Sequence, residues 1–143
     1  MYQQYCTFTV NNKKYIIMNI PDNLKYTREH EWIRTEGSEA VIGITDFAQK
    51  ELGDIVFIDI DTEGETIAAG EKFDVVEAVK TVSDLYMPVG GEILSANASL
   101  EAAPETVNKD PYGEGWMIRI QMTDPAELDM LMSAAEYKEL TNE

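Results

Sequence analysis

The sequence predicts a mainly β protein, a barrel or sandwich of short strands with short peripheral helices and a C-terminal helical segment. Three observations support this prediction. Runs of β-branched and aromatic residues recur along most of the chain, Gly- and Pro-containing turns break them every few residues, and the helix signals are short. A chain of 143 residues suits one domain that buries a sizeable core.

The first predicted strand pair begins at Glu31. EWIRTE (31–36) alternates as a half-buried strand, a Glu-Gly-Ser turn follows, and EAVIGI (39–44) returns. Thr45 then supplies an N-cap for a short helix over 47–52, which Gly53 ends.

The middle of the chain supplies the remaining strands. IVFIDID (55–61) predicts a strand with Ile55 and Phe57 on one face and Val56 and Ile58 on the other. The further predicted strands are 72–79, 81–88, 91–98 and 116–122, with a single helical turn at 104–108.

Helix signals dominate the C-terminal segment. Asp124 followed by Pro125 predicts a helix start, with an apolar stripe of Leu128, Leu131 and Met132. Ser133 to Glu136 form a second capping box, so we expect a break and a second short helix whose inner face carries Tyr137 and Leu140.

The first nineteen residues differ from the rest and are interpreted as an N-terminal extension of a domain spanning 20–143. TFTV (7–10) and KKYII (13–17) each predict a short strand, with Asn11 and Asn12 as the turn. Met18 is a candidate for the true start, and the alternative is an extra hairpin that packs on the domain.

Composition excludes several classes of function. The net charge is −16, with seven acidic and no basic residues between Lys50 and Lys72, which argues against nucleic acid or a membrane surface as partner. Cys6 is the single cysteine, so an internal disulfide is excluded. No run has the length of a membrane span and no targeting segment is seen, so we expect a cytoplasmic protein.

One lysine stands between two apolar runs, in VVEAVKTVSDLYMPVGGEI (75–93). The two strands on either side of Lys80 are consecutive with a short connection, so Lys80 is predicted at the tip of a hairpin. There its ammonium reaches water, whereas burial without a partner would cost several kcal/mol. Val76, Val79, Val82 and Leu85 are expected to supply the apolar arms.

Four sequence blocks resemble the H protein family of the glycine cleavage system. They are LKYTREHEW (24–32), GITDFAQKELGDIVFIDI (43–60), VVEAVKTVSDLYMPVGGEI (75–93) and NKDPYGEGWMIRI (108–120). They occur in the family's order and extend the resemblance from about Ile20 to Leu140.

The resemblance implies a lipoyl-type barrel-sandwich hybrid of two small β-sheets. It implies that Lys80 carries covalent lipoic acid and that Glu77 is recognised by the lipoate-attaching enzyme. The implied function is that of a non-catalytic carrier, which moves the aminomethyl group of glycine on the lipoyl-lysine arm. The implied partners are a pyridoxal-phosphate-dependent glycine decarboxylase, a folate-dependent aminomethyltransferase, dihydrolipoamide dehydrogenase and the lipoate-attaching enzyme. We expect a monomer.

A cleft for the loaded arm is a further hypothesis. The arm loaded with the aminomethyl group carries a protonated amine, and nearby carboxylates would stabilise that positive charge. Glu31 and Asp84 match acidic positions of the family, Glu29 is less secure, and His30 lies between the two glutamates. The alternative is that Glu29 and Glu31 form a solvated face beside Trp32. For His30 itself a structural hydrogen bond near Trp32 is favoured over a docking role.

Other classes of function stay open beside the carrier. A biotinyl or other acyl-carrier module is disfavoured because Val79 and Thr81 flank Lys80 where a biotinyl site has methionines. A hydrolase with paired carboxylates is supported only by the abundance of Asp and Glu. A role as a lipoate-relay hub stays open as a second function. His30 is the single histidine and no metal-ligand spacing is found, so no metal site is predicted.

Overall fold

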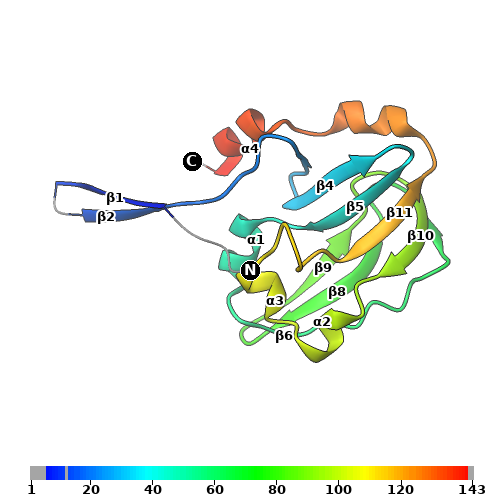
Figure 1. The fold of residues 1–143 in the computed structure, drawn as a ribbon, viewed down its shortest axis with the longest axis horizontal. Coiled ribbons are helices and arrows are strands. Elements are labelled where there is room, and N and C mark those ends of the chain that lie inside the picture. The colour runs from blue at the N-terminus through cyan, green and yellow to red at the C-terminus, as the bar shows by residue number, and fades with distance from the viewer. Residues whose placement is uncertain (1–5, 12, 142–143) are drawn as a thin grey trace.

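The computed structural model describes residues 6–11 and 13–141, and it confirms the predicted mainly β architecture (Figure 1). A six-stranded and a three-stranded antiparallel sheet pack face to face, and a separate two-stranded hairpin lies at the N-terminal end. Short helices surround the sheets, and the last helix lies beside the segment that leads from this hairpin into the six-stranded sheet (Figure 1).

The strands and helices have the following bounds. The strands are β1 Cys6–Val10, β2 Lys13–Ile17, β3 Lys25–Tyr26, β4 Glu31–Glu36, β5 Glu39–Ile44, β6 Ile55–Phe57, β7 Thr66–Ile67, β8 Lys72–Ala78, β9 Val82–Tyr86, β10 Gly91–Ala96 and β11 Ile118–Met122. The helices are α1 Asp46–Leu52, α2 Ser99–Ala102, α3 Thr106–Lys109, the 3₁₀ helix η1 Pro125–Met130, and α4 Ala134–Thr141.

The larger sheet has the strand order β3-β4-β5-β11-β10-β7. Successive side chains of a strand point to opposite faces, so Ile33 and Ile42 enter the central core while Trp32 and Val41 face the other way. This sheet therefore supplies two apolar clusters, one on each face.

The central cluster lies between the two sheets. The smaller sheet, in the order β6-β8-β9, contributes Phe73, Val76 and Leu85 to it. Each of these is at most 2% exposed, and such burial stabilises the fold by about 1.5–3 kcal/mol per large apolar side chain. The β8–β9 hairpin is thereby fixed along its length, which makes its tip a rigid support.

The second cluster joins the outer face of β4 and β5 to the C-terminal helix. Trp32, Tyr26 and Tyr137 are fully buried there, and the rings of Tyr26 and Tyr137 stack with centroids 4.7 Å apart. Gly43 lies opposite Trp32, and a Cβ at Gly43 would come within 2.8 Å of the indole ring. The tryptophan ring thus lies directly on the backbone of β5.

The strand prediction for 55–61 is wrong both in the length of the strand and in the faces of its side chains. The strand predicted over 55–61 ends at Phe57, and a register irregularity lies between Ile55 and Phe57. Because of it, Ile55 and Ile58 are buried while Val56 and Phe57 are 52% and 51% exposed, against strict alternation.

The C-terminal segment also departs from its prediction in part. The segment after Asp124 is a 3₁₀ helix, capped as predicted by the Asp124 side chain, and Leu128 and Leu131 lie against the core. The second capping box is confirmed, since Ser133 and Glu136 exchange side chain–backbone hydrogen bonds of 3.0 and 3.3 Å. Tyr137 is buried as expected, but Leu140 is 38% exposed.

The N-terminal hairpin predicted over 7–17 is present as β1 and β2, paired from Cys6–Ile17 to Val10–Lys13. It projects away from the two sheets (Figure 1). Residues 1–5 of the predicted extension and Asn12 of its turn lie outside the described residues. Within 6–11 and 13–141, no helix is long and apolar enough to cross a membrane.

Candidate functional site

Lys80 lies at the tip of the β8–β9 hairpin, as predicted, and is exposed. The tip is closed by the backbone N–H of Ala78, which donates to the carbonyl of Thr81 at 2.8 Å. The backbone N–H of Val79 donates to the carbonyl of Asp54 at 2.9 Å, which ties the tip to the segment after α1. Among the ion pairs recorded for the described residues, none involves Lys80.

The stem of Lys80 lies over the C-terminal end of α1. Gly53 caps this helix with a φ of 77°, a left-handed conformation that favours glycine, and its N–H donates to the Gln49 carbonyl. A Cβ at Gly53 would stand 3.4 Å from Cε of Lys80 and 3.9 Å from its Nζ. The positive φ is therefore what requires glycine here, and the lysine stem passes within van der Waals reach of this position.

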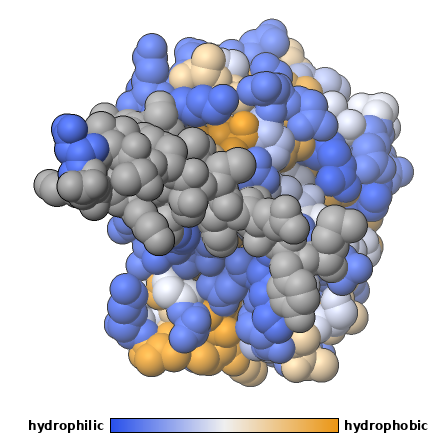
Figure 2. All heavy atoms as spheres, turned by 60° about the vertical axis from the view of Figure 1, so that its left-hand side comes forward, coloured by the Kyte–Doolittle hydropathy of each residue, from blue (hydrophilic) through white to orange (hydrophobic). Residues whose placement is uncertain are grey.

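Apolar side chains surround the tip on its solvent side. Val79 and Val82 are 73% and 61% exposed, so of the four predicted apolar arms only Val76 and Leu85 are buried. Glu77 is exposed and lies in register between Phe57 of β6 and Val82 of β9. Figure 2 shows a mostly hydrophilic face with an apolar patch along the lower end of the molecule, where Figure 1 places β6 and this hairpin.

The four residues predicted for the cleft line one cavity of about 130 Å³. Glu29, His30 and Glu31 reach it from the β3–β4 connection, and Asp84 reaches it from β9. Its other lining residues are Ile44, Ala48, Glu51, Leu52, Val76, Ser83 and Leu85. The cavity thus combines an apolar wall with four carboxyl groups, and it shares helix α1 with Lys80, whose stem lies over the end of that helix.

Glu31 is a buried carboxyl group, only 2% exposed. Its Oε1 accepts a hydrogen bond of 2.6 Å from the Thr27 hydroxyl, and its Oε2 accepts one of 3.3 Å from the backbone N–H of Tyr86. Burial raises the pKa of Glu31 to about 7, although these hydrogen bonds act in the opposite direction. Near neutral pH the group therefore exists in both protonation states.

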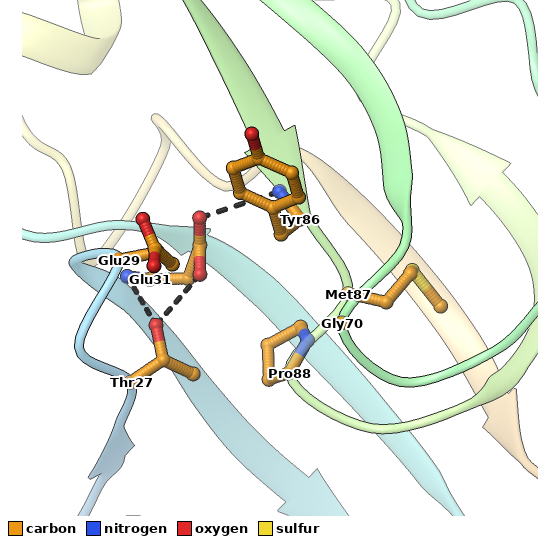
Figure 3. Close-up of a pocket in the computed structure, with 7 residues that line it drawn as sticks. All are labelled: Thr27, Glu29, Glu31, Gly70, Tyr86, Met87 and Pro88. Carbon is orange, nitrogen blue, oxygen red and sulfur yellow. Dashed lines mark hydrogen bonds between the residues drawn. The ribbon is translucent and has the colours of Figure 1, made fainter.

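Glu31 also lines a second cavity, of about 250 Å³ (Figure 3). Its lining residues are Thr27, Glu29, Glu31, Gly70, Tyr86, Met87 and Pro88. Glu29 and Glu31 belong to the lining of both cavities.

His30 makes a structural hydrogen bond, as predicted, and its partner Tyr137 belongs to the same buried cluster as Trp32. Its Nδ1 lies 2.8 Å from the Tyr137 hydroxyl, which is also 2.7 Å from Oγ1 of Thr45. Burial lowers the pKa of His30, so the ring is neutral at neutral pH and leaves the charge of the adjacent carboxylates uncompensated.

Asp84 stands at the exposed rim of the cavity. Its Oδ1 lies 3.8 Å from Nζ of Lys72, and its Oδ2 accepts a hydrogen bond of 3.4 Å from the Tyr86 hydroxyl. Both members of the ion pair are about half exposed, so the pair is weak and leaves Asp84 accessible.

Sequence reasoning missed several residues of the site. Thr27 and Tyr86 bind Glu31, and Tyr137 binds His30 from the other end of the chain. Apart from Val76 and Leu85, the residues of the apolar wall were also not identified. No sequence spacing signals these contacts, because they depend on how the strands and α4 pack. In 6–11 and 13–141 no group of three or more His, Cys, Asp or Glu could hold a metal ion.

Comparison with known proteins gives a consistent result. The family model described as "Glycine cleavage H-protein" matches residues 24–143. The chain is 59% identical over 125 residues to the glycine cleavage system H protein of Bacteroides fragilis, covering 87% of this chain and 99% of the relative. The corresponding protein of Chlorobium limicola is 57% identical over 128 residues, covering 88% of this chain and all of the relative.

A solved structure is similar as well. The crystal structure of a glycine cleavage system H protein from Mycobacterium marinum superposes with a TM-score of 0.79 at 39% identity, covering 87% of this chain and all of that chain.

Proposed function

Because the chain belongs to the glycine cleavage H-protein family, the lipoyl-bearing carriers of the glycine cleavage system, we propose that lipoic acid is joined to Lys80 by an amide bond. The observation that carries this proposal is the exposed lysine at the tip of a hairpin whose strands are packed into the core. Acylation of this amine requires no rearrangement of the fold and breaks no recorded ion pair.

The proposed domain spans 20–143, and its role is to position the arm while partner enzymes perform the reactions. The lipoyl group, when bound, supplies the sulfur that carries the aminomethyl group from the glycine decarboxylase to the aminomethyltransferase. The proposed partners also include dihydrolipoamide dehydrogenase and the lipoate-attaching enzyme. The lipoate-attaching enzyme would contact Glu77, which lies three residues before Lys80. A tip exposed to solvent allows each enzyme to approach it in turn.

The cavity at Glu31 fits the loaded arm chemically. Ile44, Leu52 and Leu85 offer apolar surface for a methylene chain, and the carboxyl groups of Glu31 and Asp84 offer acceptors for a protonated amine. In a poorly hydrated site a charge-assisted hydrogen bond of this kind contributes about 1.5–3 kcal/mol. These residues would therefore retain the amine and shield it from water.

Glycine-dependent exchange of carbon dioxide with the decarboxylase tests the carrier function. The lipoylated protein is expected to support exchange, Lys80→Arg is expected to abolish it, and Lys72→Arg, at the base of the same hairpin, is expected to retain it. Exchange supported by the Lys80→Arg protein would contradict the attachment site.

The half-life of the loaded arm tests the cleft separately. Glu31→Gln and Asp84→Asn remove one acceptor each and are expected to shorten the half-life, while Glu92→Gln removes an exposed strand carboxylate elsewhere and serves as the control. Unchanged lifetimes in both cleft variants would contradict the cleft and leave the attachment site standing.

A further inference from the structure

Thr27 is the residue most closely bound to Glu31, although the function described above gives it no role. Its hydroxyl donates to Oε1 of Glu31 at 2.6 Å and accepts from the Glu31 backbone N–H at 3.1 Å (Figure 3). Its own backbone N–H donates to the Glu31 carbonyl at 3.0 Å. One threonine thus fixes both the backbone and the carboxylate of Glu31.

The turn between these two residues adds to this restraint. The Thr27 carbonyl accepts a hydrogen bond of 3.1 Å from the His30 N–H, which closes a four-residue turn. His30 has a φ of 70°, a left-handed conformation that is uncommon for a residue other than glycine. The hydrogen bond between Nδ1 of His30 and the Tyr137 hydroxyl accompanies this conformation, so both Thr27 and His30 restrain the turn that carries Glu31.

Burial, and after it the negative charge of Glu29, favours the neutral form of Glu31. The titratable groups around it are Glu29 and His30 on the same turn, Glu51 on α1, Asp84 and Tyr86 on β9, and Tyr137 on α4. His30 is neutral near pH 7, and no ion pair with Glu31 is recorded among the described residues. Hydrogen-bond donors are therefore what stabilises the charged carboxylate, and of the two carboxylate donors Thr27 makes the shorter bond.

We propose that Thr27 is a positioning residue that keeps Glu31 aimed and charged, ready to accept the amine of the loaded arm. This inference rests on the proposed function of the Glu31 cavity. A protonated Glu31 would lose its electrostatic attraction for an ammonium group, and a carboxylate free to rotate would lose its fixed direction. Thr27 acts through Glu31 and is not expected to contact the arm itself.

Thr27→Val tests the proposal, because valine has nearly the shape of threonine without the hydroxyl. Thr27→Ser keeps the hydroxyl and is the rescue variant, and Thr35→Val makes the same change at an exposed position of β4. Thr27→Ala is a second hydroxyl-free variant in case valine perturbs the fold. The pKa of Glu31 is measured by carboxyl ¹³C NMR in protein without lipoate, with Glu31→Gln to assign its resonance.

We expect the pKa of Glu31 to rise by about one to two units in Thr27→Val, since a hydrogen bond to a charged group is lost. Thr27→Ser and Thr35→Val should leave it unchanged. In the lipoylated and loaded protein, the half-life of the arm at about pH 8 should fall several-fold in Thr27→Val, as the charged fraction of Glu31 falls. The difference in half-life between Thr27→Val and the unmodified chain should narrow by about pH 5, where Glu31 is mostly protonated in both proteins.

Two results separate this inference from the proposed function. If Glu31→Gln leaves the half-life unchanged, the retention role of the cavity fails and this inference fails with it. If Glu31→Gln shortens the half-life but Thr27→Val changes neither the half-life nor the pKa of Glu31, only the role of Thr27 is overturned. A shortened half-life with an unchanged pKa would also overturn it, because that result indicates a purely structural effect.

Discussion

Replacing the buried carboxyl group of Glu31 by an amide should change how the stability of the protein depends on pH. Burial raises the pKa of Glu31 from 4.5 in a model compound to about 7 in the fold. Between these two values the folded protein binds more protons than the unfolded chain at this site. The free energy of unfolding must therefore fall as the pH rises from about 4.5 to 7, because the folded state then has to ionise a buried acid.

The size of this effect follows from the two pKa values. Each pKa unit corresponds to about 1.4 kcal/mol, so the difference between 4.5 and about 7 amounts to about 3 kcal/mol. This is a sizeable part of the 5–15 kcal/mol that is typical of a folded domain. Glu31→Gln has no proton to lose, so its contribution to stability is constant across the same range.

Urea unfolding at a series of pH values measures this difference. Other ionisable groups affect both proteins alike, so the quantity of interest is the stability of Glu31→Gln minus that of the unmodified chain. We expect this difference to rise by about 3 kcal/mol between about pH 4 and 8, whatever constant offset the amide introduces through its hydrogen bonds.

Glu92→Gln, which removes an exposed carboxylate of β10, should give a difference that is nearly independent of pH. Parallel stability curves for Glu31→Gln and the unmodified chain would refute the reasoning, because they would mean that the pKa of Glu31 is the same in both states.

Two further predictions concern the second cluster. Tyr137→Phe leaves Nδ1 of His30 and Oγ1 of Thr45 without their shared partner. It should lower the free energy of unfolding, measured in urea, by about 1–3 kcal/mol. A loss of stability no larger than that caused by Leu140→Ala, at the exposed side of α4, would contradict this prediction. Gly43→Ala places a methyl group 2.8 Å from the ring of Trp32. It should lower the free energy of unfolding by about 1–3 kcal/mol and shift the tryptophan fluorescence. An unshifted spectrum together with unchanged stability would contradict this packing.

Sequence reasoning predicted the hairpin tip well because its signals are local. Two consecutive apolar runs with a short connection require a turn, and an unpaired lysine at their junction requires solvent. Helix α1 was predicted for the same kind of reason: Thr45 accepts a hydrogen bond from the Ala48 N–H, and Gly53 ends the helix. Cap and turn chemistry depends on residues within one or two turns of one another.

Features that depend on tertiary packing were not predicted. Phe57 was expected on the same face as Ile55, but the irregularity in the β6–β8 pairing exposes it, and no residue pattern marks that irregularity. Glu31 was predicted as a cleft acid by resemblance, while its near-complete burial depends on Thr27 and on the neighbouring strand β9. The resemblance thus indicated which residues to inspect, and the packing gives Glu31 its chemical character.

The mass of the intact protein after incubation with a lipoate-attaching enzyme and lipoate tests the attachment of the arm most directly. We predict a mass increase of one lipoyl group for the unmodified chain and for Lys72→Arg, and no mass increase for Lys80→Arg. A lipoyl increment that persists in Lys80→Arg, or a biotin increment at Lys80 under matched conditions, would contradict the assignment of this lysine as the carrier of lipoic acid.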